Sequence, residues 1–176
     1  MTIERFHFDG LQLLTPLIHR DKRGYFMESF RSSDFEDIGF VQDNQAESVY
    51  GVIRGLHFQK PPFAQTKLIR VLDGRILDVV VDLRPTAKTF KMAFSIELSA
   101  DNNKQLLVPK GFAHGYSVLS GSAKILYKVD RVYNPSAECG IHLDSCGVDW
   151  RVPAGKRIIS KKDADLPLLS EIRTPF

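Results

Sequence analysis

Alternation of apolar and polar residues runs through much of the chain and restricts its fold more than any other feature. In residues 92–99, Met, Phe, Ile and Leu alternate with Ala, Ser, Glu and Ser, as in a strand that buries one face. Turn residues separate such segments at short intervals, at Gly24, Gly51, Gly74, Gly111, Gly121 and Pro135. Strands and helices do not alternate. The sequence therefore predicts an all-β protein, an antiparallel sandwich or small barrel.

Few local signals indicate helices. Ser33 precedes residues 34–38 and Gly39 follows them, which predicts one short capped helix. A further turn or two of helix is expected within residues 163–171. Between residues 67–72 and 75–83, Asp73-Gly74 predicts a hairpin turn, because this dipeptide tolerates positive φ angles.

Length and charge limit the classes of function. A chain of 176 residues with 43% hydrophobic content can bury one core, so we expect a single domain over residues 1–176. A net charge of +3, without a block of Lys and Arg, favours a small anionic ligand over nucleic acid. Neither a signal peptide nor a membrane span is expected. Cys139 and Cys146 give little support to a disulfide or metal site, so we expect a cytoplasmic protein with free thiols.

Two polar side chains share strand faces with apolar residues. Lys67 falls on the face of Ile69 and Val71, and Tyr127 on the face of Ile125. Lysines are seldom buried without a partner. The residues alone leave open that Lys67 reaches water at a strand end, and that Tyr127 is a hydrogen-bonded core tyrosine.

Two histidines are further candidates for a site. His57 shares its face with Gly55 and Gln59, which leaves open space before the imidazole. A lone histidine is more often structural, and this reading also applies to His114. An inward imidazole, ammonium and phenol on three strands nevertheless favour a catalytic site, because they supply a base, an oxyanion partner and an acid.

The segments 51–59 and 109–114 resemble the two histidine motifs of the cupin barrel, G-x5-H-x-H and P-x-G-x-x-H. Cupins often bind Fe, Mn or Zn through two or three imidazoles and a carboxylate. Here Gln59 stands where the second histidine of the pair would be, and an amide is a poor ligand for these metals. We therefore expect no metal, with a metal-dependent cupin oxygenase or isomerase as the alternative.

Seven segments carry a closer resemblance along nearly the whole chain. They are D-x-R-G-x-F-x-E at 21–28, Q-D-N at 42–44, R-G-L-H-F-Q at 54–59, Q-T-K at 65–67, D-V-V-V-D-L-R at 78–84, P-K-G-F-A-H-G at 109–115 and I-S-K-K-D at 159–163. On these segments the chain resembles the dTDP-4-dehydrorhamnose 3,5-epimerase family. The resemblance implies a cupin jelly roll without metal or cofactor, usually a homodimer. It also implies the substrate dTDP-4-keto-6-deoxyglucose, in the route to dTDP-L-rhamnose.

The same resemblance implies roles for individual residues. His57 matches the general base, and Asp163 matches the carboxylate that holds its imidazole. Tyr127 matches the opposing acid, and Lys67 matches the partner of the C4 oxygen. Other positions match residues that contact sugar, diphosphate or thymine: Arg23, Phe26, Glu28, Gln42, Asn44, Arg54, Gln59, His114 and Tyr133. Without the resemblance, Tyr133 would be read as an exposed turn residue.

Some alternatives stay open. A single-carbon epimerase acting at C3 or C5, or an epimerase of another nucleotide-linked sugar, would use the same catalytic residues. A non-catalytic module that binds sugar nucleotides is a third class. The loop before Trp150 is shorter than is usual in the family, and Arg151 follows where the family tends to place proline. These departures concern loop geometry and substrate fit.

Overall fold

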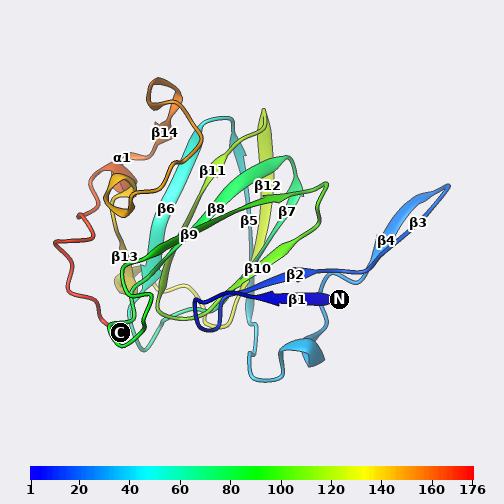
Figure 1. Cartoon of the computed structure of the whole chain (residues 1–176), viewed down its shortest axis with the longest axis horizontal. Helices are drawn as coiled ribbons and strands as arrows, with labels where there is room; N and C mark the ends of the chain where they lie inside the picture. Colours follow the sequence, from blue (N-terminus) through cyan, green and yellow to red (C-terminus); the bar gives the residue numbers. More distant parts are fainter.

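Two sheets face each other in the computed structural model, which describes all 176 residues (Figure 1). The first sheet has the order β1 (Thr2–Arg5), β2 (Gln12–Thr15), β10 (Gln105–Val108), β7 (Lys67–Asp73), β12 (Ser122–Val129) and β5 (Gln42–Val49). The second has the order β13 (Glu138–Gly140), β6 (Val52–Gln59), β11 (Phe112–Val118), β8 (Arg75–Asp82) and β9 (Ala93–Ser99), and β14 (Ile158–Ile159) pairs parallel with β6. All other strand pairs are antiparallel, which confirms the predicted all-β sandwich.

The remaining elements are short. β3 (Ile18–Asp21) and β4 (Gly24–Met27) form a hairpin that projects from the sandwich (Figure 1). The helical segments are η1 (Ser32–Phe35), η2 (Pro135–Ala137), η3 (Leu143–Cys146), η4 (Ala154–Lys156) and α1 (Lys161–Ala164). The helix predicted at 34–38 is instead a 3₁₀ turn over Ser32–Phe35, and Ser33 lies within it and does not cap it. The helix predicted within 163–171 lies at Lys161–Ala164, so residues 165–171 are not helical. No helix is long and apolar enough to span a membrane.

The hairpin predicted at Asp73-Gly74 is wrong. β7 ends at Asp73 and β8 begins at Arg75, as expected, but the two strands belong to different sheets. Both β7 and β8 already have neighbours on each side, so the connection crosses from one sheet to the other instead of pairing them. Gly74 has a φ of 74°, and a Cβ there would lie 2.0 Å from the carbonyl oxygen of Ser122. Glycine is therefore needed at this crossover. The local sequence of such a crossover cannot be distinguished from that of a hairpin turn.

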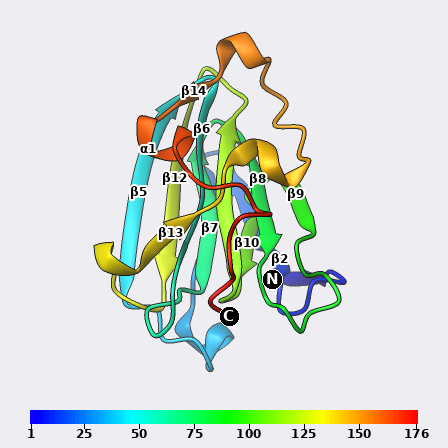
Figure 2. The same ribbon diagram turned by 90° about the vertical axis from the view of Figure 1, so that its left-hand side faces the viewer.

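Apolar clusters fill the space between the sheets and cover their outer faces. Alternation along β8 divides them: Ile76 and Val80 enter the cluster between the sheets, whereas Leu77 and Val79 enter the cluster on the outer face. The C-terminal segment runs across that outer face (Figure 2). Trp150 is fully buried in the cluster there. Asp78 falls on the inward face of β8 by the same alternation, so a charged group is placed between the sheets.

A break in strand pairing determines which side chains of β6 face inward. His114 of β11 lies opposite His57, but Tyr116 lies opposite Arg54, so two residues on β11 span three on β6. Such an irregularity changes the alternation of the longer strand. As a result Arg54 and His57, which simple alternation would place on opposite faces, both line one cavity. Gly55, at the irregularity, has a φ of 108°.

We expect Gly55→Ala to destabilise the protein by about 2 kcal/mol or more, because the residue must take a positive φ and meet backbone atoms. A Cβ at Gly55 would lie 2.7 Å from both Gly115 Cα and the His114 carbonyl oxygen. Urea unfolding would measure the change. Gly39→Ala is the matched control, since a Cβ there meets nothing within 4 Å. Equal stability of the two variants would contradict this account of β6.

Candidate active site

Two adjoining hollows of about 530 and 290 Å³ lie between the sheets and share three lining residues. The shared residues are His57, Lys67 and Tyr127, the three inward polar groups expected from the sequence. His57 comes from β6 of the second sheet, whereas Lys67 and Tyr127 come from β7 and β12 of the first. The imidazole and the phenol therefore enter the cavity from opposite walls.

The His57 imidazole is held by a buried carboxylate from the C-terminal part of the chain. Its Nε2 lies 2.7 Å from Asp163 Oδ1, while Asp163 Oδ2 accepts a hydrogen bond from the Gly55 amide at 3.2 Å. Ser160 caps α1 by accepting from the Asp163 amide at 3.0 Å, which fixes the start of this short helix. With Nε2 facing the carboxylate, His57 Nδ1 is left as a proton acceptor.

Asp163 is ionised in this setting. Burial raises the pKa of its carboxyl, but the hydrogen bond and charge of His57 lower it more, together with bonds involving Gly55 and Ser160. The resulting pKa lies below the usual value. A carboxylate that is 4% exposed and negative at neutral pH stabilises an imidazolium beside it.

Burial shifts the pKa values of both Lys67 and Tyr127. Burial lowers the pKa of Lys67 to about 8, against the opposing effect of the negative charges of Asp78 and Glu138. Burial also raises the pKa of Tyr127, so the phenol keeps its proton at neutral pH. The cavity thus offers a proton acceptor, a cation and a phenolic donor.

A second histidine, His114, and an arginine, Arg54, also line the larger hollow. His114 Nε2 lies 3.0 Å from each oxygen of Asp78, and both residues are buried. Arg54 Nε donates to Ser48 Oγ at 3.1 Å, and Ser48 Oγ lies 3.3 Å from the Tyr116 hydroxyl. Each of these side chains is oriented by a neighbour.

The smaller hollow is lined by residues predicted to bind substrate. Gln42 accepts from the Tyr133 amide at 2.9 Å and donates to Asn44 at 2.9 Å. Gln59 is 4% exposed and has both ends of its amide occupied, by the Phe63 carbonyl at 2.8 Å and the Asn134 amide at 2.7 Å. Gln59 therefore shapes the wall by holding the loops beside it.

A cluster of three side chains lies at the border of the two hollows. Tyr133 Oη donates to Glu138 Oε2 at 2.6 Å, and Lys162 Nζ donates to the same oxygen at 2.5 Å. The bond to Glu138 raises the pKa of Tyr133. Neither Glu138 nor Lys162 is among the site residues that the sequence predicts. Lys162 stands in the I-S-K-K-D segment next to Asp163, whereas Glu138 had no local signal, because only the fold brings β13 beside α1.

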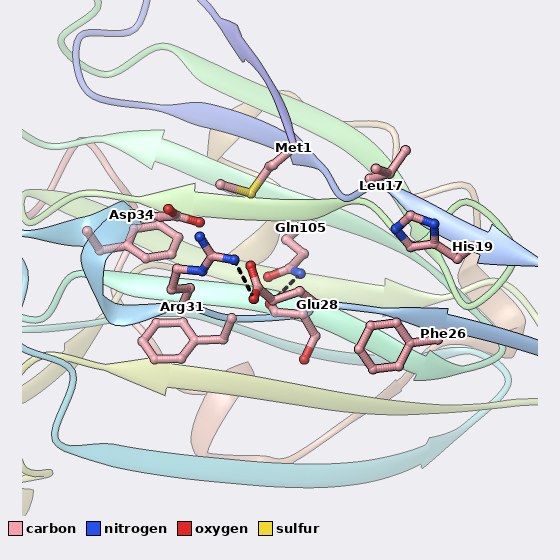
Figure 3. A pocket seen from close by; sticks show the side chains of 11 residues that line it. Met1, Leu17, His19, Phe26, Glu28, Arg31, Asp34 and Gln105 are labelled. Atoms are coloured by element: carbon pink, nitrogen blue, oxygen red, sulfur yellow. Dashed lines mark hydrogen bonds and ion pairs between the residues drawn. The ribbon is translucent and has the colours of Figure 1, made fainter.

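Three predicted substrate-binding residues do not reach this cavity within one chain. Arg23 lies in the turn of the β3–β4 hairpin, where it makes a two-pronged bond to Asp21. Phe26 is 71% exposed, and Glu28 pairs with Arg31 at 2.8 Å. Figure 3 shows Phe26 and Glu28 beside a separate hollow, which Met1 and Asp34 also line. Its volume is about 530 Å³.

The side chains offer no site of the usual composition for a metal. No group of three or more His, Cys, Asp and Glu residues is arranged to hold an ion. His57 and His114 each face a carboxylate of their own, Asp163 and Asp78, instead of converging on one point. The donor set therefore does not fit the two or three imidazoles and a carboxylate of a metal-dependent cupin.

Comparison with known proteins identifies the family. Residues 5–171 match the family model described as dTDP-4-dehydrorhamnose 3,5-epimerase. The chain belongs to this family. It is 42% identical to the dTDP-4-dehydrorhamnose 3,5-epimerase of Escherichia coli K12, over 98% of this chain and 96% of that protein.

A solved structure and a more distant relative extend the comparison. The crystal structure of the dTDP-6-deoxy-D-glucose-3,5-epimerase of Legionella pneumophila, in complex with dTDP-4-keto-L-rhamnose, has a TM-score of 0.93 and 39% identity. It matches 98% of this chain and 94% of that one. The dTDP-4-dehydrorhamnose 3-epimerase of Streptomyces niveus is 33% identical, over 98% of this chain and 86% of that protein. The fold is thus the cupin-like one of the epimerase family.

Proposed function

We propose that this chain, as one catalytic domain over residues 1–176, converts dTDP-4-keto-6-deoxy-D-glucose to dTDP-4-keto-L-rhamnose in dTDP-L-rhamnose biosynthesis. The observation that carries this proposal is the placement of His57 and Tyr127 on opposite walls of one cavity, with Lys67 between the same two hollows. Inversion at carbon needs a proton to leave one face and another to arrive on the opposite face. A base and an acid on facing sheets meet this requirement.

This geometry supports the roles that the family resemblance implies for the residues. His57, held by Asp163, removes the proton next to the C4 ketone and becomes imidazolium. The electron pair of the broken C–H bond moves into the enolate, whose oxygen is stabilised by the Lys67 ammonium. Tyr127 then donates its phenolic proton to the opposite face of the carbon. Before the second carbon reacts, His57 loses its proton to solvent and Tyr127 regains one from solvent; because C3 and C5 both flank C4, the same groups can then act on both carbons.

The nucleotide is held by polar groups around the two hollows. We assign the phosphates to Arg54, whose planar fork suits paired oxygens, and the base to Tyr133, whose ring can stack on a pyrimidine. Further contacts are assigned to Gln42, Asn44, Gln59 and His114, which line the same hollows. These contacts require no metal and no cofactor.

Arg23, Phe26 and Glu28 require a second copy of the chain to act on substrate. They lie on or next to a projecting hairpin with strongly exposed aromatic residues, away from the cavity of their own chain. We therefore propose a homodimer in which these three residues contact the substrate bound by the partner. Free Cys139 and Cys146 are consistent with a cytoplasmic protein.

The test is product analysis by NMR with dTDP-, UDP- and GDP-linked 4-keto-6-deoxyglucose as substrates. The proposal expects the dTDP sugar to be converted with inversion at both C3 and C5. Inversion at C3 alone would show a 3-epimerase like the Streptomyces niveus relative. Preference for another nucleotide would redirect the substrate assignment, and tight binding without conversion would mean a binding module.

The pKa of Lys67 predicts a loss of activity on the alkaline side. Only the ammonium form can stabilise an enolate, and burial places its pKa at about 8 in the free protein. As pH rises through that value Lys67 loses its proton, so kcat/KM, which reports groups of the free enzyme, should fall. Rate measurements across neutral and alkaline pH would check this. In Lys67→Arg the cation stays protonated, so any residual activity should lack this decline, and a decline retained in that variant would assign it to another group.

A further inference from the structure

A buried carboxylate outside the cavity joins three segments that carry site residues. Asp130 follows β12 directly and is 5% exposed. Its Oδ1 accepts a hydrogen bond from the Thr66 amide at 2.7 Å, and its Oδ2 lies 2.8 Å from Lys110 Nζ. Neither Asp130 nor Lys110 lines the cavity described above.

Each of the three segments leads into the site within a few residues. Thr66 immediately precedes Lys67, the first residue of β7. Asp130 lies three residues after Tyr127 on β12, and Lys110 lies four residues before His114 on the way into β11. One carboxylate therefore connects the strands that carry the ammonium, the phenol and the second imidazole.

Asp130 is hydrogen-bonded to both the amide and the carbonyl group of Thr66. In addition to the carboxylate contact, the Asp130 amide donates to the Thr66 carbonyl oxygen at 3.3 Å. The next residues continue the ladder, with Lys67 opposite Val129 on one side and Val108 on the other. Lys67 is thus the first residue of β7 that pairs with both neighbouring strands. Just before it, the chain is held by the bonds between Thr66 and Asp130.

A carboxylate in this place needs a reason, because burying a charge is costly unless the charge is paired and hydrogen-bonded. The Lys110 side chain is 42% exposed, so its ion pair with Asp130 adds little to overall stability. The geometry points instead to local order: we propose that Asp130 is a positioning residue that fixes the start of β7 and so places the Lys67 ammonium relative to Tyr127. This inference rests on the proposed function for its effect on turnover.

The position of Lys67 has a consequence that can be measured without substrate. Its pKa depends on burial, with Asp78 and Glu138 acting against the effect of burial. If the start of β7 loosens, water gains access to the ammonium and the pKa rises toward that of an ordinary lysine. Displacement of a catalytic group by about 1 Å costs on the order of a hundredfold in rate.

The experiment uses full-length protein with ¹³C-labelled lysine, in which the Lys67 signal is identified by its loss in Lys67→Arg. We expect the Lys67 titration midpoint to rise in Asp130→Ala and kcat to fall by about 10- to 100-fold, with a smaller change in KM. Asp130→Asn, which keeps an acceptor for the Thr66 amide, should be affected less. Lys110→Met leaves the bond between Asp130 and Thr66 in place, so its Lys67 midpoint should stay at the wild-type value, and Asp130→Asn is the test if Asp130→Ala does not fold.

Glu47→Gln is the matched control for Asp130→Asn, because it makes the same change from carboxylate to amide in the exposed pair of Glu47 on β5 with Lys124 on β12, 3.9 Å apart. Folded Asp130 variants with the wild-type Lys67 midpoint and kcat would overturn the inference, even if they unfold at lower temperature. A shifted midpoint in a protein whose wild type lacks epimerase activity would support the positioning role and refute the proposed function, so the two can fail separately.

Discussion

Replacing His57 with alanine is expected to reduce turnover by about 10⁴-fold, the upper end of what a positioned base contributes. The imidazole is the only group in the cavity whose orientation is fixed by a carboxylate from α1, and its free Nδ1 is the acceptor available for a proton on carbon. Its side chain is 28% exposed, so the substitution removes little packing and the fold should persist. Steady-state rates with the dTDP sugar, together with circular dichroism, would measure both effects.

His7→Ala is the control for this variant, because His7 is exposed in the connection between β1 and β2 and lines none of the cavities described. It should turn over at the wild-type rate. A His57 variant that retains more than about a tenth of wild-type activity would assign the base to another residue, since general base catalysis by a positioned group is worth at least about 10²-fold.

Asp163→Asn is expected to lower kcat by about 10³-fold, although it changes only one atom. The carboxylate accepts from two donors at once, the His57 ring through Oδ1 and the Gly55 amide through Oδ2. An asparagine has one oxygen, so either the Gly55 amide loses its partner or the imidazole takes the other tautomer. In that tautomer Nδ1 carries the proton and cannot act as the base.

The kinetics of Asp163→Asn should separate orientation from binding. KM should change little, because Asp163 is only 4% exposed and both of its oxygens are already bonded, to the His57 ring and to the Gly55 amide. Asp165→Asn, an exposed position at the end of the same helix, provides the control. Activity of Asp163→Asn within about tenfold of wild type would show that this carboxylate neither holds the tautomer nor stabilises the imidazolium.

Alternation and turn residues were sufficient to predict the strands and the inward direction of Lys67 and Tyr127. Each of those strands is regular where the residue lies, so the face could be read from its neighbours. The pairing of strands was harder to predict from the sequence. The Asp-Gly between β7 and β8 has the local properties of a hairpin turn. The two strands do not pair, because β10 and β12 occupy the edges of β7, and β9 and β11 occupy those of β8.

The site was predictable where side chains belong to recognisable segments, and not where the fold joins distant ones. His57 and Asp163 are 106 residues apart, and their pairing came from the family resemblance rather than from any local pattern. Asp78 begins the D-V-V-V-D-L-R segment, but its pairing with His114, 36 residues away, is made only by the fold, and Glu138 lies in a strand of three residues. The common inward face of Arg54 and His57 depends on the irregularity at Gly55, which alternation does not reveal.

The most direct test of the account is proton exchange with solvent in heavy water. The wild-type protein would be incubated with dTDP-4-keto-6-deoxyglucose in deuterated buffer, and deuterium at C3 and C5 would be counted by NMR. The account predicts one solvent deuteron at each carbon of the dTDP-4-keto-L-rhamnose formed, and none at either carbon with His57→Ala. Conversion without incorporation at C3 or C5, or incorporation that survives the loss of His57, would contradict epimerisation by this base.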